Sequence, residues 1–288
     1  MTLFKSASII TAFTLLSRIT GLVREQLMAT MFGASSMTDA FNVAFRLPNM
    51  FRRLFAEGAF SQAFVPVLGQ SKVNDGDAAT HQLVNRVATV LFVVLVVTCI
   101  IGVIAAPVLV WIMASGLKQD PRDYEAGVLM ARWMFPYIGF MSLVALGAGV
   151  LNTYKKFAIP AFTPVLLNIC MITAAWLGAP WFKTMGIEPI YAMTAGVMLG
   201  GVLQLGMQIY ALSQLGMTPQ LNLSPSGIKT AWADAGVRRV ATLMLPALLG
   251  VSVAHISAII NLQIASHLQA GSISWMGYAA VSYTHLRA

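Results

Sequence analysis

Long apolar stretches without a charged side chain constrain this chain more than any other feature. They cover residues 87–114, 137–151, 162–181 and 190–212. Most reach the roughly 20 residues that a helix needs to cross a bilayer. They are expected to be helical, because backbone N–H and C=O groups in hydrocarbon must bond to each other. With 58% hydrophobic and 10% charged residues, against about 45–50% and 25% in soluble domains, the chain is predicted to be an all-α polytopic membrane protein.

Apolar windows alternate with polar interruptions along the whole chain. They predict about seven complete transmembrane helices, plus the start of an eighth near Ser272. The predicted spans are residues 7–33, 38–69, 87–115, 128–154, 159–182, 188–213 and 238–266. Two longer polar loops are predicted, at residues 70–85 and 213–237, and the second has the proline and glycine content of a linker. We therefore expect an N-terminal lobe at residues 1–215, a cytoplasmic linker at 216–237 and the start of a second lobe at 238–279.

Lysine and arginine counts in the loops favour a cytoplasmic N-terminus, by eight basic residues inside against four outside. The inner set is Lys5, Lys72, Arg86, Lys155, Lys156, Lys229, Arg238 and Arg239, and the outer set is Lys118, Arg122, Arg132 and Lys183. Topology and the charges of the first two spans account for the net charge of +8, so no nucleic-acid partner is expected. Arg18 and Arg24 interrupt the first apolar run, so we do not expect a cleaved signal peptide.

The first two spans carry charges that a membrane helix normally avoids. Placing one arginine at a helix centre costs about 2.5–3.5 kcal/mol, so these side chains cannot all face lipid. One interpretation is ion pairing, of Arg24 or Arg18 with Glu25 and of Arg53 with Glu57, and some arginines could instead reach the interface. The two spans hold five arginines but only three carboxylates, however. The surplus predicts an anion site in a wet cavity, and the planar guanidinium suits phosphate. The charged residues are Arg18, Arg24, Glu25, Asp39, Arg46, Arg52, Arg53 and Glu57.

Helical spacing groups these residues further. Asp39, Asn42, Arg46, Asn49 and Arg53 fall on one stripe of an ideal helix, as expected of a helix that lines a cavity. In the first span, Arg18 and Glu25 share a face, whereas Arg24 lies about 120° away unless the helix bends at Gly21.

The sequence shows no catalytic chemistry. It has no nucleophile–base arrangement, phosphate-binding glycine loop or metal cluster, so we expect no enzyme activity, no catalytic residue, no metal and no cofactor. Cys99 and Cys170 lie in apolar spans and are predicted to be packing residues. Scattered polar residues such as Asn168 are predicted to make interhelical hydrogen bonds, and Gly196 and Gly200 to allow close helix packing. His255, in the middle of a span, is the candidate for proton sensitivity.

Several motifs together resemble the MurJ (MviN) lipid II flippases of the MOP exporter superfamily. They include Arg18-x-x-Gly21-x-x-Arg24-Glu25, Thr38-Asp39-Ala40-Phe41, Leu47-Pro48-Asn49-x-x-Arg52-Arg53-x-Phe55-Ala56-Glu57-Gly58, Ile159-Pro160-Ala161-Phe162 and Ser272-x-Ser274-Trp275-Met276. The resemblance runs to about Ala279 and is most specific over residues 47–66. Beyond Ala279 the family continues Asp-Arg-Leu, whereas this chain has Ala280-Val281-Ser282. We interpret residues 280–288 as a non-native tail and the chain as a C-terminally truncated copy.

The resemblance implies a MOP/MATE-like bundle that exports lipid II by alternating access across the bacterial inner membrane, for peptidoglycan synthesis, cell wall biogenesis and cell shape. It implies that Arg18, Arg24 and Arg52 bind the diphosphate, whereas the ideal stripe selects Arg53. Pro48 lies between the start of the stripe and these residues and can shift its phase, so we follow the family for Arg52 and keep Arg53 as the second candidate. Asn49 is a further binding candidate, and Asp39, Gly21 and Glu57 are gating candidates.

The sequence leaves alternatives to lipid II export. A cation-exchanging drug exporter should present carboxylates rather than surplus arginine. A flippase for another polyprenyl-diphosphate-linked oligosaccharide would need the same diphosphate site, and a truncated chain could instead be a non-transporting lipid-binding scaffold. Expected partners are lipid II and membrane lipids, and the driving force would be the membrane potential or a monovalent cation.

Overall fold

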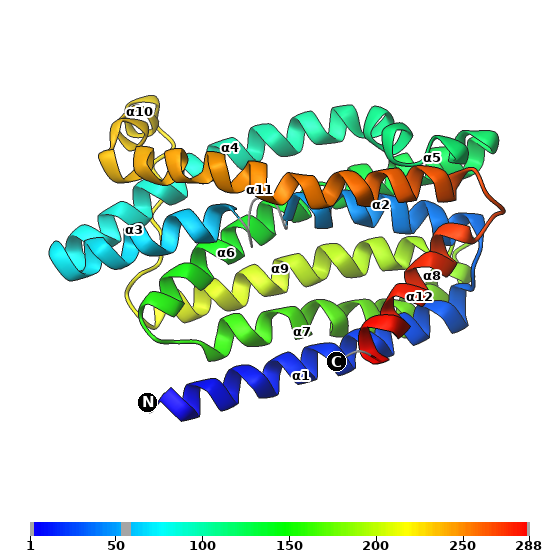
Figure 1. Cartoon of the computed structure of the whole chain (residues 1–288), viewed down its shortest axis with the longest axis horizontal. Helices are drawn as coiled ribbons and strands as arrows, with labels where there is room; N and C mark the ends of the chain where they lie inside the picture. Colours follow the sequence, from blue (N-terminus) through cyan, green and yellow to red (C-terminus); the bar gives the residue numbers. More distant parts are fainter. Residues whose placement is uncertain (1–2, 53–58, 287–288) are drawn as a thin grey trace.

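The computed structural model describes residues 3–52 and 59–286, and every regular element within these ranges is helical. Most helices align along the long axis of one bundle, while α12 crosses it obliquely and α10 sits across one end (Figure 1). The helices are α1 (Leu3–Phe32), α2 (Ser36–Arg52), α3 (Ser61–Asn74), α4 (Gly76–Met113), α5 (Pro121–Met134), α6 (Tyr137–Thr153), α7 (Ala158–Thr173), α8 (Ala179–Thr184), α9 (Tyr191–Ser213), α10 (Pro225–Ala233), α11 (Ala235–Ser266) and α12 (Ser272–Leu286). A 3-10 turn (Ser115–Gln119) precedes α5, and a π-helical stretch (Ala174–Gly178) joins α7 to α8.

The prediction of an all-α membrane bundle is confirmed. Five helical stretches in the described part of the chain are long and apolar enough to cross a membrane, at residues 7–32, 76–113, 121–153, 158–184 and 191–213. The second predicted span corresponds to α2 and α3, with residues 53–58 outside the described ranges, and the seventh corresponds to α11. The start of α12 at Ser272 matches the predicted start of the eighth helix.

The prediction of a loop at residues 70–85 is wrong. α3 continues to Asn74 and α4 begins at Gly76, so the reversal is confined to a tight turn. Gly76 makes this turn with φ +82°, a conformation that glycine adopts without strain. Polar residues reach water at a helix end and can stay helical there, so the apolar window marks where lipid contact ends rather than where the helix ends.

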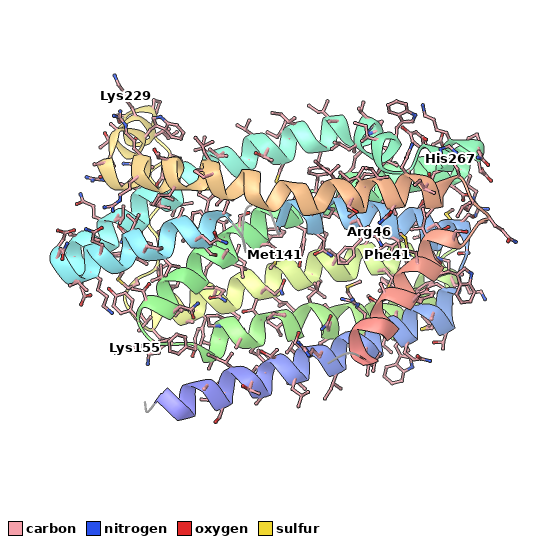
Figure 2. All side chains as sticks on the ribbon, in the orientation of Figure 1. Phe41, Arg46, Met141, Lys155, Lys229 and His267 are labelled. Atoms are coloured by element: carbon pink, nitrogen blue, oxygen red, sulfur yellow. The ribbon has the colours of Figure 1, made fainter. Side chains whose placement is uncertain are left out.

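The helices connect alternately at two ends of the bundle (Figure 1). One end, here called the linker end, carries the α3–α4 and α6–α7 turns and residues 214–224 before α10. The opposite end carries the α1–α2, α4–α5, α8–α9 and α11–α12 connections. The basic set predicted to be inside belongs to the linker end, where Figure 2 shows Lys155 and Lys229. That the linker end faces the cytoplasm stays a prediction.

Close helix contacts explain the small residues of α9. A Cβ added to Gly196 would lie 3.1 Å from the carbonyl oxygen of Cys170, and one added to Gly200 would lie 3.2 Å from the Cα of Leu167. Both tight contacts are on α7, so the predicted packing role of Gly196 and Gly200 is confirmed. Cys170 is buried in this contact and is a free thiol, as is Cys99 on α4.

The outward surface of α4 is apolar. Val97, Ile101, Ile104 and Val108 are 50%, 59%, 72% and 57% exposed. A soluble protein rarely exposes a continuous apolar patch of this kind. This face is therefore suited to lipid tails, and the polar contacts of the bundle must lie between its helices.

Candidate functional site

Asn168 on α7 forms hydrogen bonds with three residues on one face of α1. Its Nδ2 donates hydrogen bonds to the carbonyl oxygen of Ser17 at 3.0 Å and to Oγ1 of Thr20 at 3.1 Å. Its Oδ1 accepts a hydrogen bond from Nη1 of Arg24 at 2.9 Å. Ser17, Thr20 and Arg24 follow one another at helical spacing, so they share the α1 face that packs on α7. The predicted interhelical role of Asn168 is confirmed, but its contact with Arg24 was not anticipated.

The two arginines of α1 lie in different environments. Nη2 of Arg24 forms an ion pair with Oε1 of Glu25 at 2.5 Å, with side chains 19% and 25% exposed. Arg18 is exposed and has no hydrogen bond or ion pair with any residue that the structure describes. Of the pairings considered for Glu25, the structure shows the one with Arg24. The guanidinium of Arg18 thus keeps its hydrogen-bonding capacity available.

α1 is a single α-helix from Leu3 to Phe32, and it continues through Gly21. A Cβ added to Gly21 would lie 3.6 Å from Nδ2 of Asn168, which is an ordinary van der Waals distance. Gly21 therefore lies at the contact with α7, and Arg18 and Arg24 point from different faces of the helix. A gating role for Gly21 stays a prediction.

Asp39 holds the start of α12 against α2. Its Oδ2 accepts a hydrogen bond from the backbone N–H of Gly271 at 2.7 Å. Its Oδ1 accepts two more, from the N–H of Ser274 at 2.8 Å and from the Ser274 hydroxyl at 2.6 Å. Asn42, one turn further along α2, donates to Oγ of Ser274 at 3.1 Å. These bonds join α2 to the start of α12 at the opposite end of the bundle, and a gating role for Asp39 stays a prediction.

The sequence did not identify Gly271 and Ser274 as partners of Asp39. Gly271 has φ +91°, and a Cβ there would lie 2.7 Å from the carbonyl oxygen of Ala34. Only glycine meets both demands. A signal was present, because a buried carboxylate without a basic neighbour needs backbone N–H groups, and a helix N-terminus supplies them.

The structure describes only some of the remaining predicted site residues. Arg46, labelled in Figure 2, and Asn49 both lie half-buried on α2. The side chains of Arg52 and His255 lie outside what the structure describes, as do Arg53 and Glu57 altogether. Among the described residues, no group of three or more His, Cys, Asp or Glu side chains could hold a metal ion.

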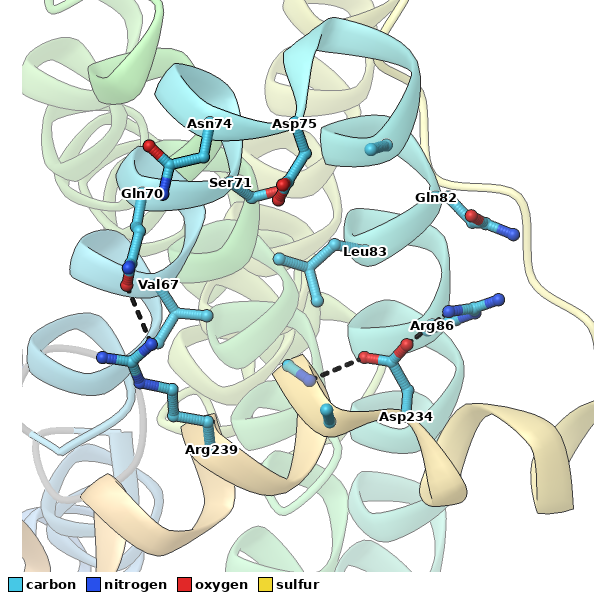
Figure 3. Close-up of a pocket in the computed structure, with 13 residues that line it drawn as sticks. Val67, Gln70, Ser71, Asn74, Asp75, Gln82, Leu83, Arg86, Asp234 and Arg239 are labelled. Atoms are coloured by element: carbon cyan, nitrogen blue, oxygen red, sulfur yellow. Dashed lines mark hydrogen bonds and ion pairs between the residues drawn. The ribbon is translucent and has the colours of Figure 1, made fainter.

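The linker end contains a hollow of about 430 Å³ between α3, α4 and the start of α11 (Figure 3). Arg86 on α4 forms an ion pair with Asp234, whose Oδ1 also accepts the N–H groups of Gly236 at 2.9 Å and Val237 at 3.1 Å. Asp234 therefore caps α11, and the ion pair joins this cap to α4.

The linker before α10 also lies along α4. Asn85 accepts the N–H of Gln220 at 2.8 Å, and Thr89 accepts that of Asn222 at 3.2 Å. The predicted linker segment is thus held to the bundle along its length. The division into two lobes around it stays a prediction.

Comparison with known proteins identifies relatives. Residues 28–286 match the profile of a family described as "Lipid II flippase MurJ". Over 279 residues the chain is 50% identical to "Lipid II flippase MurJ" of Burkholderia cenocepacia, covering 97% of this chain and 53% of that protein. Over 284 residues it is 40% identical to "Probable lipid II flippase MurJ" of Vibrio cholerae, covering 96% and 52%. The chain spans about half the length of the curated relatives it matches.

A solved structure has the same fold. It is titled "Lipid II flippase MurJ, inward closed conformation", and it superposes with a TM-score of 0.77 over 96% of this chain and 54% of that one. The sequence identity is 24%, so this likeness concerns the fold.

Proposed function

Because the chain belongs to the lipid II flippase MurJ family, we propose that it forms the diphosphate-binding half of a lipid II flippase. The substrate would be an undecaprenyl-diphosphate-linked muropeptide, carried from the inner to the outer leaflet of the bacterial inner membrane for peptidoglycan synthesis. No covalent step is involved, and flippases of this family are transporters rather than enzymes. The linker end would face the cytoplasm.

The observation that carries this proposal is the contrast between the two arginines of α1. Arg18 is exposed without a partner among the described residues, while Arg24 is oriented by Asn168 and neutralised by Glu25. A diphosphate can bond to Arg18 directly and can exchange with Glu25 for Arg24. The pairing with Glu25 would limit the cost of an uncompensated charge when the site is empty.

The contacts of Asp39 suggest how access would alternate. With α12 held by Asp39, the opposite end would be closed, and a substrate would enter from the linker end. Releasing Gly271 and Ser274 would free α12 and open the opposite end. The lipid tail can stay in the bilayer throughout, so only the charged head group needs a polar path.

A hybrid protein tests the proposal. This chain would replace the matching half of the Burkholderia cenocepacia relative, and lipid II translocation would be measured in proteoliposomes. We expect the hybrid to translocate lipid II, and Arg18→Ala and Arg24→Ala each to slow it by about tenfold or more, as loss of a charge partner should. Arg122→Ala is the matched control, because Arg122 is 72% exposed at the opposite end.

Two results would contradict the proposal. Full translocation by both Arg18→Ala and Arg24→Ala would remove these residues from the site. Binding of lipid II without translocation would instead favour a scaffold. Equal transport of an undecaprenyl diphosphate carrying another sugar would broaden the substrate class.

A further inference from the structure

A second hollow, at the opposite end of the bundle, is lined by three carboxylates and no basic side chain. Its volume is about 330 Å³, and the carboxylates belong to Asp39, Asp120 and Asp123. Its walls come from the start of α2, the 3-10 turn with the start of α5, and the α11–α12 connection. Such a concentration of negative charge stands out in a chain whose net charge is +8.

Asp123 is the carboxylate of this hollow that lacks a partner. Asp39 accepts the three hydrogen bonds from Gly271 and Ser274, and Oδ1 of Asp120 accepts the N–H of Arg122 at 2.9 Å. Asp123 is only 8% exposed, yet it has no hydrogen bond or ion pair with any residue in the described ranges. Asp123 lines the hollow, and its place in the first turn of α5 gives it only the partial positive charge of a helix N-terminus as compensation.

The basic side chains nearest in sequence are occupied elsewhere. Arg122 pairs with Glu188 at 2.9 Å. Lys118 lies over the ring of Tyr124 at 5.3 Å, and Nε2 of His267 lies 2.9 Å from Oγ of Ser115. The protein itself therefore supplies no positive charge to Asp123 among its described residues.

We propose that this hollow binds an inorganic cation that keeps part of its water shell, with Asp123 as its main anionic contact. Among the described residues, no three His, Cys, Asp or Glu side chains could hold a metal ion together, so water would supply part of the coordination. The volume of about 330 Å³ is roughly ten times the space of one liquid water, so a cation and several waters fit. Magnesium commonly binds in this manner, through one or two carboxylates and retained water.

The bound cation would stabilise the closed arrangement of this end. The hollow exists only while α2, α5 and the α11–α12 connection are together, because all three supply its walls. A ligand that binds only one arrangement shifts the equilibrium toward it. The site would therefore act together with the Asp39 contacts, but it does not depend on which lipid is carried.

Thermal unfolding of the 288-residue chain in detergent tests the site. Sodium chloride or magnesium chloride would replace choline chloride at constant ionic strength. We expect at least one of the two salts to raise the unfolding midpoint saturably. Asp123→Asn should raise the midpoint without added cation and weaken the cation response by more than about tenfold. Glu125→Gln removes the same charge from the same helix, outside this hollow, and should respond like the wild type.

A second measurement keeps the test decisive if Asp123→Asn does not fold. Hydrogen exchange of the wild type should slow at residues 265–273 when the cation is added, and Asp123→Glu should retain this effect. The proposal is overturned if neither salt changes the midpoint or the exchange, or if Asp123→Asn keeps the full response.

Discussion

Replacing Asp39 with alanine should release α12 from α2. Asp39 is 4% exposed, and its carboxylate accepts hydrogen bonds from the N–H of Gly271 and from the N–H and hydroxyl of Ser274. Alanine removes all three acceptors at once. The two backbone N–H groups then remain buried without a partner until the start of α12 moves toward water.

The size of the effect follows from these bonds. Each buried donor left without a partner costs about 1–3 kcal/mol. Two backbone donors, partly rescued by entering water, give about 3 kcal/mol, which is about a hundredfold increase in opening of this region. Asp39→Asn should be milder, because its oxygen can still accept from Ser274 while its amide group faces the N–H of Gly271.

Hydrogen exchange followed by mass spectrometry measures this opening at residues 268–278. Glu188→Gln is the matched control, because Glu188 pairs at the same end with the 72% exposed Arg122, and exposed pairs contribute only about 0–1 kcal/mol. Exchange should rise strongly in Asp39→Ala and little in the control. If both variants exchange like the wild type, Asp39 does not hold α12.

Three other substitutions probe the packing, the linker and the pH response. Gly102→Ala should destabilise the bundle by about 1–3 kcal/mol, because the added Cβ would lie 1.9 Å from the Phe135 ring. Gly206→Ala should not, because a Cβ there would have nothing within 4 Å. Thermal unfolding compares the two variants. Arg86→Ala breaks the ion pair with Asp234 and should speed cleavage of residues 217–224 by proteinase K, unlike Lys229→Ala on the exposed side of α10. Burial, and secondly a hydrogen bond to Asp77, raises the pKa of Tyr154 to about 12 from its ordinary 10.0. The neutral phenol is therefore favoured in the folded state, and the stability advantage of wild type over Tyr154→Phe should be complete below pH 10 and shrink as the pH rises toward 12.

Much of the fold could be predicted because the membrane imposes its demands on each segment separately. Length, apolarity and the absence of charge were enough to place α4, α6, α7 and α9, and the small residues of α9 indicated close packing. The loop predicted at residues 70–85 was wrong for a related reason. Hydropathy reports contact with lipid, whereas the backbone turns only where α3 ends at Asn74 and α4 begins at Gly76.

The candidate site was less predictable. Helical spacing places Arg18 and Arg24 on different faces of the first span, and α1 is one continuous helix there; the surplus of arginine was visible from counting. The ideal stripe on the second span could not show that Asp39 and Asn42 face α12. Its choice between Arg52 and Arg53 is untested, because those side chains lie outside what the structure describes.

The membrane helices, the excess of arginine over carboxylate in the first two spans and the family resemblance can all be read from the residues alone. The partner of each charge depends on the folded chain: Asn168 for Arg24 across 144 residues, the start of α12 for Asp39 across 235 residues, and none for Asp123 in the described chain. This difference comes from the range of each interaction. Satisfying a backbone in hydrocarbon is a local requirement that every helix meets alone, whereas a buried charge is stabilised only by the groups that folding brings within hydrogen-bonding distance.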